Sequence, residues 1–281
     1  MKHAVFSLIL PEFTFAEQAG LLKKLGYDGI EIRVCDIGPE HAGKPFSNWG
    51  NHRDPIGPSN IAARAPELKK IADDAGIEIP ALAPYTRVTD PEAFKPLAEA
   101  ASVLKAGVVR VTAPGYDPKT GFEGPFEASI AGLETIEGIA RDAGIKAAIE
   151  IHHGTIAPSA SGVRRILEGF DPEAVGAIVD PGNMIHEGFE NWKLGLDILG
   201  PYLAHVHVKN ALWVLKDRTE GGPFIWEARW SRLREGIGNW KTLMDALRGA
   251  GYESWLSLED FSDLAIQEKL ADDIAFLKSL E

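Results

Sequence analysis

Acidic and imidazole side chains recur in four apolar segments that follow one another in the second half of the chain. Glu150, Asp180, His207 and Glu259 each come directly after an apolar residue of such a segment. Strand side chains alternate, so the apolar neighbours should face one way and these four residues the other. Three carboxylates buried together repel one another unless a cation neutralises them. Oxygen-rich ligands with one imidazole favour Mn²⁺, Co²⁺ or Mg²⁺, so the pattern predicts one divalent metal ion bound by all four.

Each of these acids has a simpler interpretation when it is taken alone. An acid at the end of a strand commonly caps the next helix or pairs with a basic side chain. The coincidence over four segments favours the metal site. Of the other inward positions, His205 is expected to be a packed, hydrogen-bonded core residue. Glu31 and Arg33 are expected to pair with each other inside the fold.

Further polar and aromatic residues lie beside the four predicted ligands. His152 and His153 follow Glu150 and are candidates for a second acid or base, or for holding substrate oxygens. Lys209 either shields the carboxylates or stabilises an oxyanion. Three tryptophans of the segment after His207 either stack on a sugar ring or only anchor that segment: Trp213, Trp226 and Trp230.

A repeated unit indicates which elements position these residues. An amphipathic stretch, a glycine and a short apolar run recur along the chain, with the glycines at Gly26, Gly76, Gly107, Gly144, Gly169, Gly200 and Gly251. The glycine suits the end of a helix, where φ is positive, and the apolar run suits a strand buried on both faces. With a first strand over Ala4 to Ile9, these seven junctions predict eight parallel strands. The fold class is therefore α/β, a single (β/α)₈ TIM barrel domain over residues 1–281, with a doubly wound open sheet as the alternative.

Two intervals between the glycines are long and mark insertions. One runs from Val34 to Pro58 after strand 2, and the other from Asn210 to Gly238 after strand 7. Both follow the carboxyl ends of strands, where barrel enzymes keep their sites. We expect both to be long loops without regular structure that act as lids or binding loops.

Charge and cysteine content exclude several classes of partner. The net charge is −12, and no basic cluster offers the surface that nucleic acid or an anionic membrane requires. No run approaches the roughly 20 apolar residues of a membrane span. The single cysteine, Cys35, allows no disulfide framework, so a cytoplasmic protein is expected. The apolar run that ends at Leu10 is taken as part of a buried strand and not as a signal peptide. A homo-oligomer is compatible with the sequence.

The chain resembles the xylose-isomerase-like barrel superfamily, and more narrowly its sugar phosphate isomerase/epimerase family. The resemblance covers nearly the whole chain and rests on an ordered set of motifs: Gly26-Tyr27-Asp28-Gly29-Ile30-Glu31, Ile149-Glu150-Ile151-His152, Val179-Asp180-Pro181-Gly182-Asn183, His205-Val206-His207-Val208-Lys209-Asn210 and Ser257-Leu258-Glu259-Asp260. In that family Glu, Asp, His and Glu in this order bind one divalent ion, commonly manganese. The resemblance implies this role for Glu150, Asp180, His207 and Glu259. In its ketose 3-epimerases the two glutamates are also acid and base, which implies that Glu150 and Glu259 are catalytic.

The sequence departs from those epimerases where they hold the substrate. They usually carry His three residues after the ligand Asp, where this chain has Asn183, and His186 could partly replace it. They also carry Arg shortly after the ligand His, where this chain has Trp213. These departures imply a different mode of substrate recognition.

The expected chemistry begins with proton removal next to a carbonyl. A divalent ion that binds a hydroxyl and the adjacent carbonyl oxygen acidifies the hydrogen between them and stabilises the enediolate, while a carboxylate takes the proton. Return of the proton gives an epimer or an isomer of a sugar or polyol. Loss of a β-substituent instead gives a lyase, such as a dehydratase acting on a keto-sugar or keto-inositol. Isomerase or epimerase is the leading prediction and lyase the alternative, because both share the first step.

Two other classes of protein fit the sequence less well. A phosphodiesterase like the DNA-repair endonucleases of the superfamily would need several metal ions and a basic groove, whereas this chain has eight histidines and is acidic. A barrel that only binds sugar has no need of four convergent metal ligands.

Overall fold

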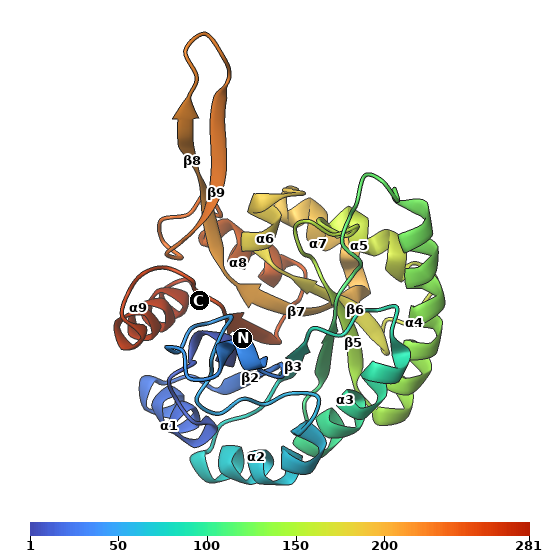
Figure 1. Cartoon of the computed structure of the whole chain (residues 1–281), viewed down its shortest axis with the longest axis vertical. Helices are drawn as coiled ribbons and strands as arrows, with labels where there is room; N and C mark the ends of the chain where they lie inside the picture. Colours follow the sequence, from blue (N-terminus) through green and yellow to red (C-terminus); the bar gives the residue numbers. More distant parts are fainter.

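Eight parallel strands close into a barrel, which confirms the predicted fold class (Figure 1). The computed structural model describes all 281 residues. The barrel strands are β1 (Lys2–Phe6), β2 (Gly29–Val34), β3 (Ala81–Pro84), β4 (Val108–Val111), β5 (Lys146–Glu150), β6 (Val175–Val179), β7 (Leu203–Val208) and β10 (Trp255–Leu258). They follow one another around the barrel in chain order, and β10 pairs with β1 to close it. All eight carboxyl ends therefore meet at one end of the barrel, here called the mouth.

Helices surround the barrel (Figure 1). They are α1 (Phe15–Leu25), α2 (Ile61–Ala75), α3 (Pro91–Leu104), α4 (Glu123–Ala143), α5 (Ala160–Leu167), α6 (Pro181–His186), α7 (Trp192–Leu199), α8 (Trp240–Gly249) and α9 (Ile266–Ser279). Their apolar faces pack on the strands in one cluster of 62 buried residues. None of them combines the length and the apolar character needed to cross a membrane.

The helix ends follow the predicted glycine pattern with one exception. Gly26 and Gly144 end α1 and α4 in the left-handed conformation, with φ of 88° and 66°. Gly107 does not end α3, because Lys105 takes that position with φ of 58°. Gly107 instead belongs to the chain that enters β4, where its N–H bonds to Pro80. Because Gly107 lies two residues beyond Lys105, the glycine pattern places the end of α3 too late, but it gives the correct order of the elements.

The first strand is shorter than predicted. β1 ends at Phe6, and a 3₁₀ turn, η1 (Ser7–Ile9), replaces the expected continuation to Ile9. The hydroxyl of Ser7 accepts a hydrogen bond from the N–H of Arg33 at 2.7 Å, which bends the chain away from the strand direction. The turn brings Leu8 to the wall of the mouth.

The two insertions differ in structure. The segment after β2 is a long loop with one 3₁₀ turn, η2 (Pro39–His41). The segment after β7 is not without regular structure as expected. It forms a two-stranded antiparallel hairpin, β8 (Asn210–Arg218) and β9 (Phe224–Ser231), which stands out from the barrel (Figure 1). β8 begins with an apolar run from Ala211 to Leu215, apolar and charged residues alternate from Trp226 to Trp230 in β9, and a turn with Gly221 and Gly222 joins the strands.

Candidate metal centre and active site

Four potential metal ligands converge at the mouth. Glu150 is the last residue of β5, Asp180 and Glu259 directly follow β6 and β10, and His207 lies in β7. One donor atom from each lies within 4.8 Å of one donor atom from every other. All four side chains are buried, with exposed fractions of 0 to 4%. The structure thus brings together the four residues that the sequence singled out, because neighbouring parallel strands end side by side.

A fourth buried carboxylate, Glu31, orients His207. The Nε2 atom of His207 lies 3.3 Å from Glu31, while its Nδ1 atom lies 3.0 Å from Glu150 and 3.5 Å from Asp180. If Nε2 donates to Glu31, Nδ1 keeps its lone pair for the carboxylate side, where a metal ion would be held. His205 lies 3.1 Å from the other oxygen of Glu31, so it is the hydrogen-bonded core residue expected.

The expected pairing of Glu31 with Arg33 is wrong. Arg33 donates to the carbonyl oxygen of Asn48 at 2.9 Å and lies 2.7 Å from His52. Both partners belong to the long loop after β2. Glu31 turns instead toward the two imidazoles of β7, which offer it two hydrogen bonds inside the barrel.

Asp180 caps a helix with one carboxylate oxygen and faces the other proposed metal ligands with the second, so it fits both roles that the sequence left open. Its Oδ1 atom accepts the N–H of Asn183 at 2.8 Å and so caps α6. Its Oδ2 atom faces the cluster, where the ammonium group of Lys209 lies 2.7 Å away. The same ammonium group contacts Glu259. Lys209 therefore shields two of the carboxylates directly.

Arg110 is a functional candidate that sequence reasoning missed. It lies in β4, is 4% exposed, and donates to Glu150 at 2.9 Å and to the carbonyl oxygen of Pro84 at 3.0 Å. A signal was available, because Arg110 stands between Val109 and Val111 in an otherwise apolar strand. Alternation there requires Arg110 to face the interior, where a guanidinium needs an acidic partner.

The charges of the cluster fit one divalent ion. Glu31, Glu150, Asp180 and Glu259 carry four negative charges, and Arg110 and Lys209 carry two positive ones, which leaves an excess of two when both imidazoles are neutral. Burial by itself would lower the pKa of His207, but the charge of Glu31 and hydrogen bonds to Asp180 and Glu150 raise that pKa well above its usual value. The cluster therefore calls for further positive charge, and three carboxylates with one imidazole suit a divalent cation.

A cavity of about 300 Å³ opens above these residues. Glu150, Glu259 and Lys209 form part of its floor, and aromatic residues of the surrounding loops line it, among them Trp49, Tyr85, Trp230 and Phe261. This volume lies at the lower end of the range for small-molecule sites.

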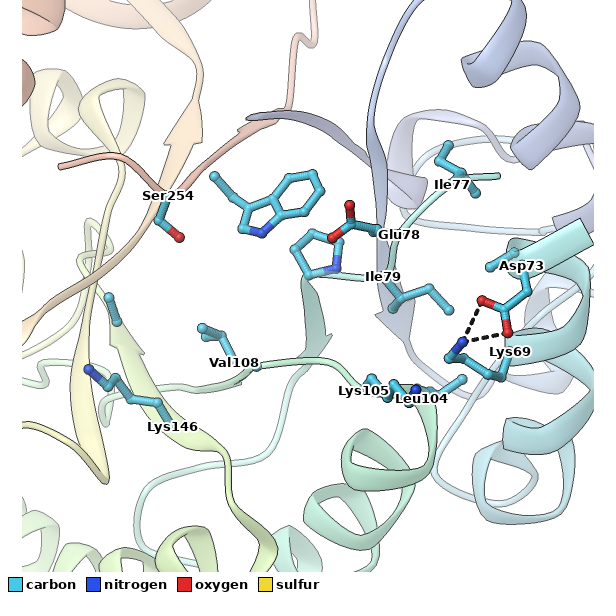
Figure 2. Close-up of a pocket in the computed structure, with 15 residues that line it drawn as sticks. Lys69, Asp73, Ile77, Glu78, Ile79, Leu104, Lys105, Val108, Lys146 and Ser254 are labelled. Carbon is cyan, nitrogen blue, oxygen red and sulfur yellow. Dashed lines mark hydrogen bonds and ion pairs between the residues drawn. The ribbon is translucent and has the colours of Figure 1, made fainter. Parts of the chain in front are cut away.

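A larger hollow, about 470 Å³, lies at the opposite end of the barrel (Figure 2). Its acids are already paired there, Asp73 with Lys69 and Glu78 with Lys2. It contains no imidazole or thiol. The groups suited to chemistry are therefore at the mouth.

The model of the family described as xylose isomerase-like TIM barrel matches residues 19–280. The chain belongs to this family. The curated relatives that it matches include an inosose dehydratase of Geobacillus thermodenitrificans (strain NG80-2), 27% identical over 168 residues, which are 54% of this chain and 53% of that protein. The chain thus spans about half the length of the curated relatives it matches.

Two solved structures show the same fold over nearly the whole length. The 3-keto-D-glucoside 4-epimerase of E. coli superposes with a TM-score of 0.74, at 16% identity and over 99% of each chain. A xylose isomerase-like TIM barrel protein of Mycobacterium smegmatis, in complex with magnesium, gives 0.69 at 16% identity, over 99% of this chain and 96% of that one. At such identity the likeness establishes the fold alone.

The predicted substrate residues of this xylose isomerase-like barrel take different places. His152, His153 and Asn183 line the cavity, and His153 lies 3.1 Å from the amide oxygen of Asn183. His186 does not line it; its ring stacks on His153 and is tilted against Trp230, with ring centroids 4.8 and 4.1 Å away.

Trp213 also lies outside the cavity. Its indole N–H donates to the carbonyl oxygen of Ile185 at 2.9 Å and so anchors the hairpin to α6. Trp230, its neighbour on the same side of the hairpin, lines the cavity instead. Of the tryptophans that the sequence offered for stacking on a sugar ring or for anchoring the segment, Trp230 lines the cavity and Trp213 anchors the hairpin.

The two glutamates of the cluster differ in basicity. Burial raises the pKa of Glu259, and the nearby Lys209 opposes this only in part. Burial acts in the same direction on Glu150, but the charge of Arg110 and the hydrogen bond with His207 lower the pKa of Glu150 well below its usual value. Glu150 is thus held ionised, and Glu259 is the more basic of the two.

Proposed function

We propose that the chain is a divalent-metal-dependent sugar isomerase or epimerase that removes a proton next to a carbonyl and acts through an enediolate. The observation that carries the proposal is the set of four buried donors at the barrel mouth, two of which, Glu150 and Glu259, line a small cavity. The surrounding cluster is short of two positive charges when both imidazoles are neutral. Such a site is suited to a small ligand with adjacent oxygens.

Glu150, Asp180, His207 and Glu259 would hold the metal ion. Carboxylate oxygens and one imidazole suit Mn²⁺, and Co²⁺ and Mg²⁺ share these preferences. When bound, the ion polarises a hydroxyl and the neighbouring carbonyl oxygen and stabilises the negative charge that develops on them. Glu31 keeps the His207 ring oriented, and Arg110 keeps Glu150 ionised as a ligand.

Glu150 and Glu259 are the proposed catalytic carboxylates. Glu259 is assigned the proton on the carbon next to the carbonyl, because it lines the cavity and, in the metal-free protein, burial raises its pKa whereas Arg110 holds the pKa of Glu150 low. Return of that proton by Glu259 to the neighbouring carbon gives isomerisation. Epimerisation needs a proton on the opposite side; because Arg110 holds Glu150 ionised, Glu150 would have to take that proton from water before delivering it to the carbon. Lys209, which contacts Glu259, can then stabilise the oxyanion.

The cavity favours an unphosphorylated sugar or polyol. Its two cations are already engaged, Arg110 with Glu150, and Lys209 with Asp180 and Glu259. A phosphate group would find no free cation there. His152, His153 and Asn183 are placed to bind hydroxyl groups, and the indole of Trp230 offers an apolar surface for the ring.

A lyase that dehydrates a keto-inositol or keto-sugar is the second candidate. The similarity to the inosose dehydratase favours it over other lyases, although that match covers about half of each protein. Elimination from the same enediolate needs an acid for the departing hydroxyl. His152 and His153, which line the cavity beside Glu150, are the candidates for that acid.

Analysis of the product separates the two candidates. We would incubate the Mn²⁺-loaded protein with a panel of ketoses, 3-keto-sugars and inososes and identify the products by NMR. An epimer or isomer of unchanged mass is expected. A product that has lost water would replace the isomerase with the lyase, and no turnover of any compound would contradict both.

A further inference from the structure

Three aromatic side chains form a continuous wall from the floor of the cavity to its rim. At the floor, the ammonium group of Lys209 lies 4.9 Å from the ring centroid of Trp230 and 5.4 Å from that of Phe261. The ring centroid of Phe261 in turn lies 5.7 Å from that of Trp230 and 4.7 Å from that of Trp49. Trp49 belongs to the loop after β2, Trp230 to β9 and Phe261 to the segment after β10. Three distant parts of the chain thus contribute to one apolar surface, here called the aromatic wall.

Exposure to water increases along the aromatic wall. Glu150 and Lys209 at the floor are 2% and 3% exposed, whereas Trp49 at the outer end is 56% exposed. Tyr85, which also lines the cavity, is 44% exposed. The floor is therefore polar and buried, and the rim is aromatic and open. A ligand that binds only at the floor leaves Trp49 and Tyr85 in water.

The size of the cavity limits what can bind at the floor. Its volume of about 300 Å³ corresponds to roughly ten water-sized groups at about 30 Å³ each. A single hexose ring is of about this size. When such a ring occupies the floor beside Glu150 and Glu259, any group attached to it must extend to the rim.

The position of Trp49 is fixed although its ring is exposed. The carbonyl oxygen of Asn48 accepts a hydrogen bond at 2.9 Å from the buried guanidinium group of Arg33. On the other side of Trp49, the N–H of Gly50 donates to the carbonyl oxygen of Ser47 at 3.1 Å. Because the neighbours of Trp49 are held in this way and its ring packs on the aromatic wall, little conformational entropy is lost when a ligand covers it.

The charges of the cavity indicate what kind of group suits the rim. Both cations that line the cavity are engaged, Arg110 with Glu150, and Lys209 with Asp180 and Glu259. The rim itself offers aromatic faces. Such a surface favours an uncharged ring with an apolar face, which can stack on an indole.

We propose that the substrate is a glycoside of a keto-sugar, whose reacting ring occupies the floor and whose second ring stacks on Trp49. The proposal rests on the proposed function for the chemistry at the floor and adds a binding site for the group across the glycosidic bond. The keto group provides the acidic hydrogen, and the glycosidic bond stays intact during proton transfer. The second ring is that of an aromatic aglycone or of another sugar, because both present an apolar face.

Binding measurements test this site separately from turnover. The Mn²⁺-loaded protein would be titrated by calorimetry with the methyl glycoside, the phenyl glycoside and a disaccharide of the same keto-sugar, 3-keto-glucose. A ligand with a second ring should bind about 10-fold more tightly than the methyl glycoside, and the tighter of the two identifies the kind of ring. Equal affinity for all three, or no binding of any up to about 10 mM, would overturn the proposal. Turnover of free ketoses beside such a result would leave the proposed function standing.

Variants of the loop after β2 show whether Trp49 provides the preference. Trp49→Ala should reduce the preference for the second ring to about 2-fold or less, whereas Trp49→Phe, which keeps a ring, should retain part of it. Phe46→Ala is the matched control, because Phe46 lies in the same loop and is 42% exposed but does not line the cavity. This control should keep the full preference. A preference that survives in Trp49→Ala, or that Phe46→Ala abolishes equally, would contradict stacking on Trp49.

Discussion

At the scale of single residues, the site depends on the balance of buried charges. Glu150 is 3% exposed at its side chain, and its partner Arg110 is 5% exposed. Because both side chains are buried, neither can reach solvent if its partner is removed. A buried ion pair of this kind contributes little compared with an apolar pair, but loss of one member leaves an uncompensated charge.

Replacement of Arg110 should therefore destabilise the protein strongly. We expect Arg110→Met to cost about 3–5 kcal/mol, because the Glu150 carboxylate stays buried without its partner. In a protein of this size the melting temperature should fall by roughly 10 °C in calorimetry with EDTA present. Arg53→Met is the control, since Arg53 and Glu17 form an exposed ion pair that is screened by water and contributes little to stability. Equal melting temperatures of the two variants would show that the buried pair does not act as described.

Asp273 gives a prediction about pH. It is 2% exposed on α9, and burial together with the negative charge of Asp260 raises the pKa of Asp273 to about 8. Because this pKa lies above that of an unfolded aspartate, the stabilising contribution of the protonated form is complete below about pH 4. It is lost as the pH rises toward 8.

Asp273→Asn should remove this pH dependence. The amide is neutral and can donate to Asp260, so the variant should unfold at a higher temperature than the wild type at pH 8.5. At pH 5 the difference should be much smaller. Thermal unfolding at the two pH values measures it, and a variant that is less stable at pH 8.5 would contradict a buried, protonated Asp273.

The four proposed metal ligands could be predicted from the sequence, whereas the residues that contact them could not all be predicted. Glu150, Asp180, His207 and Glu259 could be picked out because each stands at a fixed place relative to an apolar strand. The partners of Glu31 could not be found in this way. Its nearest cation in the sequence is Arg33, but its actual partner His205 lies 174 residues away and is brought near only by closure of the barrel.

At the scale of elements, close packing of helices on loops explains why certain positions lack a side chain. α4 contains Gly132 and Gly138. A Cβ atom at Gly132 would lie 2.1 Å from the carbonyl oxygen of Val88, whereas one at Gly138 would meet nothing within 4 Å. The same substitution should therefore have opposite effects at the two positions.

Gly132→Ala should destabilise the protein by about 1–3 kcal/mol, because α4 must move away from the segment after β3. Gly138→Ala should stabilise it by about 0.5–1 kcal/mol through the better helix propensity of alanine. Urea unfolding of both variants measures the difference. A stabilised Gly132→Ala variant would mean that α4 does not pack on Val88 as closely as described.

Element order was predictable because each helix–glycine–strand unit repeats, but some local structure was not. The hairpin after β7 is not predicted because Ala211 to Leu215 form a continuous apolar run without alternation and charged residues follow around Lys216. Those charges stand at the bulge and the tip, where water surrounds them. The place of Lys105 at the end of α3 was missed for a related reason, since Gly107 nearby offers the stronger signal.

At the scale of the whole molecule, barrel closure brings strands from both ends of the chain together. β1 pairs with β10, and the proposed ligands come from the second half of the chain. A metal ion bound there would link β5, β6, β7 and β10. Ligands that bind only the folded state stabilise it by mass action.

Binding of Mn²⁺ should therefore raise the melting temperature of the protein above its value in EDTA. At a free concentration 100 times the dissociation constant, the gain is about 2.7 kcal/mol, or roughly 5–10 °C. Asp180→Asn should lose most of this gain, because the amide replaces a charged ligand. Asp197→Asn, at an exposed position on α7, should keep it. An equal gain in both variants would place the metal ion elsewhere.

Proton exchange tests the central claim most directly. The Mn²⁺-loaded protein would be incubated in D₂O with the ketose or keto-polyol panel, and deuterium at the carbon next to the carbonyl followed by NMR. We predict exchange that stops with EDTA, falls at least about 100-fold in Glu259→Gln, and persists in Glu253→Gln, an exposed glutamate before β10. Exchange by Glu259→Gln at the wild-type rate, or none by a wild-type protein with its metal bound, would contradict the enediolate mechanism at this site.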